Sequence, residues 1–308
     1  MTRRPATIEE LATVVRDAYA HGTPLRIVGA GSWLGAGGAV TVRAERLELS
    51  ELRGIVDYVP GDLTLTARSG TTLAEIDAAT APHGQWCPLL PWGDDAATVG
   101  AVFATATTGP FERALGRPRD LALGLQFVDG AGATVRGGGR VVKNVAGFDL
   151  TRLLVGSWGT LGVITELSIR LRARPKSDES WVLALDWKDD AVARGRLSEY
   201  ENGPFAPLAL ERITADGCAS VGLTPAPSVV VRIGGNASFV GASRAALFTL
   251  GRAEPCAPSI WTRYRAAFGN TPGLVRENAP AAALGERVRS RFDPRRILNP
   301  GILSAVAA

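Results

Sequence analysis

The apolar and polar positions of this chain follow two periods, which divide it into short helices and strands. Near the N-terminus, Thr7 and Glu10 fit a helix capping box, and apolar residues then recur at helical spacing as far as His21. Elsewhere, runs of Val, Ile and Leu bounded by Gly, Pro or Asp predict strands. The predicted helices cover residues 8–21, 72–80, 97–105, 191–200, 239–250 and 281–291, and residues 149–155 form a short amphipathic segment. The predicted strands cover residues 25–28, 47–49, 55–59, 63–68, 121–128, 133–135, 163–171, 181–187, 208–213 and 228–233.

The order of these elements predicts an α+β protein in three parts. Asp129 and Gly130 lie between two predicted strands and are a strong hairpin signal. The composition changes in the polar run from Arg174 to Ser180, which we interpret as a linker. We therefore expect a first domain at 1–175, a small α+β domain with an antiparallel sheet at 176–280, and a helix and tail at 281–308 that return to the first domain.

Composition narrows the class of protein. Hydrophobic residues make up 46% of the 308 residues, enough for a sizeable core, and the 36 glycines and 19 prolines follow no period. The three cysteines, Cys87, Cys218 and Cys256, are far apart, so we expect reduced thiols and neither disulfides nor a zinc site. We see no signal peptide and no apolar run of membrane-spanning length, which predicts a cytoplasmic protein.

The charge pattern does not point to nucleic acid. The formal net charge is +4, and all but three of the 34 basic residues are arginines, since Lys143, Lys176 and Lys188 are the only lysines. These arginines are spread along the chain and alternate with acidic residues rather than forming a basic stripe.

A glycine-rich loop follows the strand predicted at residues 25–28. Its glycines, Gly29, Gly31 and Gly35, suggest a dinucleotide-binding Rossmann turn, which requires a helix directly afterwards. Here further glycines and then the β-prone residues 40–42 leave no room for that helix, so we reject the Rossmann fold. The backbone amides of such a loop can still form an anion-binding nest. For the loop in isolation, a tight turn without a ligand is the better interpretation, and only the neighbouring motifs favour a ligand.

Two more segments are rich in small residues. Gly156, Gly159 and Gly162 precede a predicted strand, and without a Cβ a flat ligand can lie on their main-chain amides. Residues 97–110 contain mostly Ala, Thr and Gly, which fits either a buried helix or a second wall of a ligand site.

Taken in order, these segments resemble the FAD-linked oxidases of the vanillyl-alcohol oxidase (PCMH) type, and in particular the FAD-binding small subunits of bacterial glycolate oxidases. The resemblance covers about residues 5–175 and 285–303, and the middle region matches only loosely. The motifs that carry it are the glycine loop, the segments at 58–64, 70–75 and 97–110, the K-N-x-A-G-F-D run at 143–149, the glycines at 156–162 and the Leu-Asn-Pro-Gly sequence at 298–301. It implies a two-part PCMH-type FAD-binding domain, a small cap domain and a tail that returns to the FAD domain.

The resemblance implies FAD as cofactor and a set of cofactor-binding residues. We predict non-covalent binding, because the loop at Gly31 and Ser32 lacks the histidine through which related proteins attach the flavin, and because Cys87 matches no attachment site. Ala101 stands where a second glycine is common in the family. The predicted cofactor-binding residues are Val28, Gly29, Ala30, Gly31, Ser32, Trp33, Thr98, Val99, Gly100, Ala104, Thr105, Gly109, Lys143, Asn144, Gly162, Val163, Ile164, Glu166 and Asn299.

Substrate chemistry is harder to find in the sequence. The oxidation of a 2-hydroxy acid needs an acceptor for the hydroxyl proton, usually a histidine, and a cation for the carboxylate. The chain has only His21, at a predicted helix end, and His83, in a predicted surface turn. Four arginines could bind the carboxylate: Arg113, Arg117, Arg119 and Arg212. Because the chain has so many arginines, surface ion pairs are the better interpretation for these four. We therefore assign no catalytic residue and no metal site.

The resemblance thus implies an FAD-binding subunit of a glycolate oxidase complex with little activity alone. The implied partners are a larger FAD-bearing catalytic subunit and an iron–sulfur subunit, with the complex at the inner face of the membrane. Two alternatives stay open: a stand-alone FAD-dependent oxidase or dehydrogenase of another alcohol or a sugar, in which Arg263 or Tyr264 would replace the histidine, and a flavin-free scaffold that kept the fold.

Overall fold

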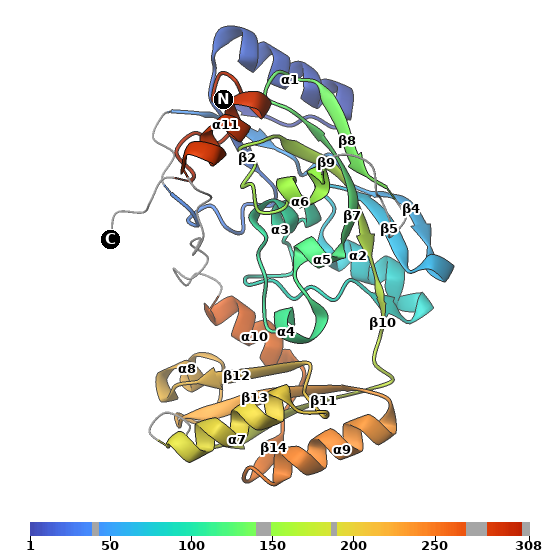
Figure 1. Ribbon diagram of the computed structural model, residues 1–308, viewed down its shortest axis with the longest axis vertical. Helices are drawn as coiled ribbons and strands as arrows, with labels where there is room; N and C mark the ends of the chain where they lie inside the picture. Colours follow the sequence, from blue (N-terminus) through green and yellow to red (C-terminus); the bar gives the residue numbers. More distant parts are fainter. Residues whose placement is uncertain (39–42, 140–148, 186–189, 269–281, 304–308) are drawn as a thin grey trace.

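The computed structural model describes residues 1–308 except 39–42, 140–148, 186–189, 269–281 and 304–308, and it confirms the predicted α+β class (Figure 1). A parallel sheet contains β1 (Thr2–Arg3), β3 (Glu45–Glu48) and β2 (Leu25–Val28), in that order. An antiparallel sheet contains β4 (Ile55–Val59), β5 (Thr64–Arg68), β9 (Val163–Arg170), β7 (Ala122–Val128) and β8 (Thr134–Gly138). A second antiparallel sheet contains β12 (Ala209–Ile213), β13 (Ser228–Gly235), β11 (Ser177–Ala184) and β14 (Ala253–Pro255). The short strands β6 (Gln85–Trp86) and β10 (Arg172–Ala173) pair with each other.

The helices cover these sheets. Those of the first part are α1 (Ile8–His21), α2 (Leu73–Thr80), α3 (Val99–Thr105), α4 (Glu112–Leu115), α5 (Pro118–Leu121) and α6 (Leu150–Leu154). The later ones are α7 (Ala191–Asn202), α8 (Ala215–Ser220), α9 (Ala237–Phe248), α10 (Ser259–Phe268) and α11 (Ala282–Phe292).

The N-terminal helix forms as the sequence predicts. The Thr7 side chain accepts a hydrogen bond from the Glu10 amide, and Gly22 ends the helix in the left-handed conformation. The buried face of α1 packs on the parallel sheet and the C-terminal tail, in a core that includes Leu11, Val15 and Leu298. The helix therefore covers the sheet whose strand β2 leads into the glycine loop.

The five-stranded sheet confirms the predicted hairpin. Strands β7 and β8 pair antiparallel, and the Asp129 carboxylate accepts hydrogen bonds from the amides of Ala131 and Ala133 at 3.0 and 2.8 Å. The main core lies between this sheet and α3, with Phe103 and Phe127 fully buried. Because α3 rests on β5 and β9, the sheet fixes one wall of the site described below.

In the later part of the chain, the four-stranded sheet has a core on each face. Along β13, Val229, Val231 and Ile233 face α7 and α9, whereas Val230 faces α8 and α10. This alternation is the period of two expected for a strand buried on both sides. The α10-side core also contains Trp86 and Phe111 from the first part, so the two parts share one hydrophobic core.

The linker predicted from Arg174 to Ser180 is only half right, because β11 begins at Ser177. Its polar residues are compatible with a strand since their charges are paired. The Asp178 carboxylate accepts two hydrogen bonds from Arg232, at 2.9 and 2.6 Å, and Glu179 pairs with Arg244 at 2.8 Å. The domain boundary placed near 175 stays a prediction, and the one near 280 lies outside the described residues.

The C-terminal tail returns to the N-terminal region, where α11 lies near α1 (Figure 1). Asp293 is fully buried, and its carboxylate accepts hydrogen bonds from the amides of Ile297 and Leu298 at 3.0 and 2.9 Å. Leu298 then forms a parallel bridge with Leu25 of β2. A single carboxylate thus holds the turn that places the tail beside the strand leading to the glycine loop.

We predict that Asp293→Ala destabilises the protein by about 3 kcal/mol, because it leaves two buried amides without an acceptor. Urea unfolding monitored by circular dichroism measures the loss. As a control, Asp17→Ala replaces an exposed carboxylate of α1 and should change stability by no more than about 0.5 kcal/mol. Equal effects of the two variants would show that the tail is not held by Asp293.

Candidate cofactor site

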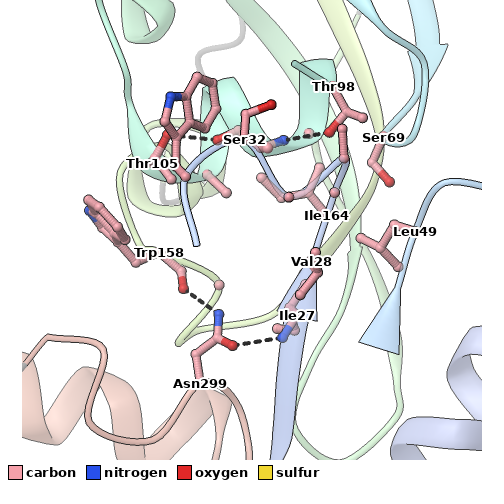
Figure 2. A pocket seen from close by; sticks show the side chains of 18 of the residues that line it. Ile27, Val28, Ser32, Leu49, Ser69, Thr98, Thr105, Trp158, Ile164 and Asn299 are labelled. Carbon is pink, nitrogen blue, oxygen red and sulfur yellow. Dashed lines mark hydrogen bonds between the residues drawn. The ribbon is translucent and has the colours of Figure 1, made fainter. Parts of the chain in front are cut away.

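Several of the segments singled out in the sequence meet around one cavity (Figure 2). It is partly open to solvent, and about 100 Å³ of it is accessible to a water-sized sphere. The cavity is lined by residues 26–34, 36, 49, 69, 97, 98, 100, 101, 104, 105, 158, 159, 162–164, 299 and 302. The glycine loop, α3, the start of β9 and the tail therefore converge on a single space.

The glycine loop offers unused hydrogen-bond donors. None of the backbone amides from Gly29 to Trp33 donates a hydrogen bond to any residue that the structure describes. Gly31 has a φ of +89°, which turns the loop in the manner of an anion-binding nest. Gly29, Gly31, Ser32 and Trp33 are partly buried, and partly buried amides normally find an acceptor. Their lack of one among the described residues favours an anionic ligand over a plain turn.

The amides at the start of α3, by contrast, donate hydrogen bonds within the protein. The Val99 and Gly100 amides donate to the carbonyls of Thr71 and Ser69 at 2.8 and 2.9 Å, and the Ala101 amide donates to the Thr98 hydroxyl at 3.4 Å. The start of this helix is therefore satisfied by the protein itself. It forms a wall of the cavity, whereas the glycine loop supplies the donors.

Glycines allow the walls to approach one another. A Cβ at Gly29 would lie 2.3 Å from the Thr98 hydroxyl oxygen, and one at Gly100 would lie 2.5 Å from the Ser69 Cβ. A Cβ at Gly162 would lie 2.5 Å from the ring of Phe127. These three glycines are needed for contact between protein segments, in addition to any contact with a ligand.

Two arginines place positive charge beside the free amides. Arg26 lines the cavity, donates a hydrogen bond to the Leu34 carbonyl at 2.9 Å and has no carboxylate partner within the described ranges. Burial, and second the neighbouring Arg46, lower the pKa of Arg26 from its usual value. Arg46 is itself paired with Glu48 at 2.6 Å. The uncompensated charge of Arg26 suits an anion such as a diphosphate.

The cavity also borders a polar group that lacks a partner. Ser69 is 1% exposed, and its hydroxyl oxygen has no hydrogen-bond partner among the described residues. An orphaned buried hydroxyl beside a cavity indicates that a ligand or an ordered water completes its hydrogen bonding. Together with the free amides and Arg26, it shows that the residues present fit a large anionic ligand with polar groups along its length, as FAD is.

Asn299 joins three walls of the cavity. Its side-chain oxygen accepts a hydrogen bond from the Ile27 amide at 2.7 Å, and its side-chain nitrogen donates to the Trp158 carbonyl at 2.8 Å (Figure 2). Both side-chain groups are thereby used within the protein, so Asn299 holds the site together, although it also lines it.

Most of the predicted cofactor-binding residues lie on the cavity. Those that line it are Val28, Gly29, Ala30, Gly31, Ser32, Trp33, Thr98, Gly100, Ala104, Thr105, Gly162, Val163, Ile164 and Asn299. Three others do not: Val99 is fully buried, Glu166 lies further along β9, and Gly109 packs so closely on Leu90 that a Cβ would lie 1.7 Å from its carbonyl oxygen. Lys143 and Asn144 lie outside the described residues.

A buried arginine that sequence reasoning missed links the cap to the glycine loop. The Arg265 guanidinium, on α10, donates to the carbonyls of Pro91 and Asp94 at 2.6 and 3.3 Å and pairs with the Asp95 carboxylate at 2.7 Å. The segment it holds accepts hydrogen bonds from the loop, because the Trp33 indole donates to the Trp92 carbonyl and the Ser32 hydroxyl to the Asp94 carboxylate, at 3.0 and 3.3 Å. Among 31 arginines, no local signal distinguishes this one.

A second cavity lies between the first part of the chain and the cap. Residues 92, 108–110, 112, 113, 116, 117, 120, 201 and 207–211 line it, with four carboxylates and two guanidinium groups. The Tyr264 hydroxyl, which does not line this cavity, donates to the Glu211 carboxylate, which does, at 2.8 Å. The pKa of Glu211 is raised, mainly by burial and further by the nearby charge of Glu201. The hydrogen bond from Tyr264 and the charge of Arg212 act in the opposite direction and lower it in part. A cavity with this excess of acidic groups is a poor site for the carboxylate of a hydroxy acid.

The histidines and arginines considered for substrate chemistry make contacts at the protein surface instead. His21 is exposed at the end of α1, with Nδ1 2.8 Å from the Asp17 carbonyl, and His83 is exposed with its ring against Tyr58. Arg113 and Arg212 both pair with Glu201 at 3.0 Å, Arg117 pairs with Glu112, and Arg119 is exposed. The surface ion pairs predicted for Arg113, Arg117 and Arg212 are thus confirmed.

The cysteines do not form disulfides, as predicted. Cys87 is buried, and desolvation raises the pKa of its thiol to about 12, so it is an inert core residue and does not line the cavity. Within the described ranges, no group of three or more His, Cys, Asp or Glu side chains is arranged to hold a metal ion. Of the helices that the structure describes, none has both the length and the apolar character needed to cross a bilayer.

Comparison with known proteins indicates FAD as the cofactor. Residues 1–138 match the FAD binding domain family. The chain is 42% identical to the glycolate oxidase subunit GlcE of Escherichia coli over 202 residues. These residues make up 65% of this chain and 55% of that protein. It is 28% identical over 235 residues to the glycolate oxidase subunit GlcD of Bacillus subtilis, 74% of this chain and 50% of that protein. The chain thus spans about half the length of these relatives.

Solved structures share the fold. Alkyldihydroxyacetonephosphate synthase superposes with a TM-score of 0.77 over 97% of this chain and 76% of that one, at 14% identity. A p-cresol methylhydroxylase gives a TM-score of 0.66 over 94% of this chain and 63% of that one, at 15% identity. At these identities the likeness concerns the fold alone, and it confirms the predicted PCMH-type architecture.

We predict that Arg26→Gln weakens FAD binding about tenfold or more, because a charge-assisted contact to an anion is lost. Isothermal titration with FAD measures the change, and the difference from the unmodified protein should shrink at high salt. Arg26→Lys keeps the charge and should retain most of the affinity. Arg252→Gln, at an exposed ion pair with Glu254, is the control, and an equal loss in this variant would contradict a local role for Arg26.

We also predict a pH-dependent effect of Glu211→Gln on stability. Because the pKa of Glu211 is raised in the folded state, the folded protein holds this proton more tightly than the unfolded chain, and the resulting stabilisation is lost as pH rises through the folded pKa. Glutamine does not titrate and can still accept the Tyr264 hydrogen bond. Unfolding measured across a pH series should show the variant gaining stability relative to the unmodified protein as pH rises, and a constant difference would contradict this origin.

Proposed function

We propose that the protein is the FAD-binding subunit of a glycolate oxidase complex, because residues 1–138 match the FAD binding domain family. The proposed complex oxidises glycolate, or a related 2-hydroxy acid, to the corresponding 2-oxo acid. In this proposal the chain binds FAD and contributes to the assembly, and it has little activity toward glycolate on its own.

One observation carries the proposal: Gly29 to Trp33, Arg26 and Ser69 line the same cavity. Among the described residues, the loop amides have no acceptor, Arg26 has no carboxylate partner and the Ser69 hydroxyl has no hydrogen-bond partner. The amides and Arg26 would hold the diphosphate of FAD. The residues at the start of β9, from Gly162 to Ile164, would contact the cofactor through their backbones. When bound, FAD supplies the two-electron redox chemistry that the side chains lack.

Non-covalent binding is part of the proposal. The cavity lining contains neither histidine nor cysteine in the part of the chain that the structure describes. His21 and His83 are exposed elsewhere, and the Cys87 thiol is buried outside the cavity. No described residue of the types that attach a flavin therefore lies where the cofactor would be held.

The assignment of substrate chemistry to the complex has a physical basis. The second cavity is lined by more carboxylates than guanidinium groups, and its arginines are already paired with Glu112 and Glu201. Tyr264, considered as a replacement for the missing histidine, donates its proton to Glu211, and burial and that carboxylate raise the pKa of its hydroxyl. These groups are poorly suited to bind a hydroxy acid and remove its proton.

Partner subunits follow from this division of roles. A relative 42% identical to the chain is named as a subunit of glycolate oxidase, which supports an assembly here too. We propose a larger FAD-bearing catalytic subunit and an iron–sulfur subunit as partners, because the described residues contain no cluster of cysteines to carry electrons onward. Attachment of this complex to the inner face of the membrane would be through its partners.

The test is to purify the tagged full chain from its native cells under gentle conditions, and again after a high-salt wash that removes partners. We expect flavin absorbance in both preparations, release of FAD by acid precipitation, and an iron–sulfur protein only in the first. Addition of glycolate should bleach the flavin absorbance of the first preparation and not of the second.

Other outcomes would contradict the proposal in identifiable ways. A colourless chain that takes up no added FAD would indicate a scaffold without flavin. Bleaching of the washed chain by another alcohol or a sugar would indicate a stand-alone oxidase or dehydrogenase. Flavin that stays on the acid-precipitated protein would contradict non-covalent binding alone.

A further inference from the structure

We propose that the Ser69 hydroxyl is a hydrogen-bond partner of the adenosine half of FAD, a role that no sequence motif indicates and that rests on the FAD site proposed above. Ser69 follows β5, where the chain turns from the five-stranded sheet toward α2. Its side chain is 1% exposed and borders the cavity.

The backbone of Ser69 is fixed on both sides. Its amide donates to the Thr165 carbonyl at 2.8 Å, and its carbonyl accepts from the Gly100 amide at 2.9 Å. The absence of a side chain at Gly100 lets the two backbones touch, since a Cβ there would lie 2.5 Å from the Ser69 Cβ. The backbone that carries the hydroxyl is therefore held in place before any ligand binds.

The hydroxyl itself is unused. Within the described residues, the Ser69 oxygen has no hydrogen-bond partner, and a buried hydroxyl without one is unfavourable. Burial among side chains would give it no way to gain a partner, but Ser69 borders the cavity. A ligand in that cavity can supply the missing donor or acceptor.

The position of Ser69 favours the adenosine half over the flavin ring. Ser69 and Leu49 lie on the side of the cavity away from Thr105 and Trp158 (Figure 2). Around Ser69 the lining is apolar and buried, with Val28, Leu49 and Ile164 all at most 6% exposed. A flat, uncharged ring fits such a slot, and a purine offers ring nitrogens to accept from a hydroxyl and an amino group to donate to it.

The opposite end suits the redox ring. Thr105 and Trp158 there also line a further cavity, and Trp33 of the glycine loop donates its indole hydrogen to the carbonyl of Trp92, which lines the second cavity. A ring that exchanges electrons must lie where substrate or a partner can approach it, whereas adenine needs no such access. The diphosphate, held between the two ends by the loop amides, leaves the Ser69 end for adenosine.

The test compares Ser69→Ala with a matched control, Thr165→Val, in the full chain freed of flavin. Thr165 is also fully buried and its hydroxyl is also unpartnered among the described residues, but it does not line the cavity. Isothermal titration with FAD and with ADP gives the affinities, and thermal unfolding without ligand gives the effect on the fold.

We expect Ser69→Ala to weaken FAD and ADP about tenfold each, the size of one lost hydrogen bond, and to leave the unfolding midpoint unchanged or higher. Thr165→Val should leave both affinities unchanged. Unchanged affinities for Ser69→Ala, a loss for FAD without a loss for ADP, or a lowered unfolding midpoint would each overturn the proposal. Failure of the unmodified protein to bind FAD would instead refute the proposed function, so the two failures are distinguishable.

Discussion

The site depends on the close approach of protein backbones. Around the cavity, Gly29 lies against Thr98, Gly100 against Ser69, and Gly70 so near the Leu49 carbonyl that a Cβ would lie 2.0 Å from its oxygen. Any side chain at these positions would push the glycine loop, α3 and the end of β5 apart. The walls of the cavity are consequently made of peptide groups, and its chemistry is set by which of those groups are free.

The positions of the amides that lack an acceptor determine where an anion can bind. The first amides of α3 are used by the carbonyls of Thr71 and Ser69, whereas those from Gly29 to Trp33 have no acceptor among the described residues. Arg26, which lines the same cavity, adds a charge that has no carboxylate partner in the part of the chain that the structure describes. An anion is therefore held by the loop and not by the helix, although both segments are rich in the small residues that suggest an anion site.

Much of this was accessible from the sequence, because glycine positions and helix caps are local signals. The glycine loop, the hairpin at Asp129 and the returning tail all follow from short motifs. Ser69, Arg26 and Arg265 were not found, since their roles come from tertiary proximity: the guanidinium of Arg265 meets a carboxylate 170 residues earlier in the chain. Polar residues led us to interpret the start of β11 as a linker, because the ion pairs that allow a strand there involve distant partners.

Arg265 also ties the later part of the chain, in which we predict a cap, to the glycine loop. Its side chain is 2% exposed and is bonded to three groups of the segment from Pro91 to Asp95. That segment in turn accepts hydrogen bonds from Ser32 and Trp33 of the glycine loop. Moving the cap away would leave a buried guanidinium unpaired, which is strongly unfavourable. The cap and the glycine loop are therefore held as one unit, and the cap supports the cofactor site whether or not it binds substrate.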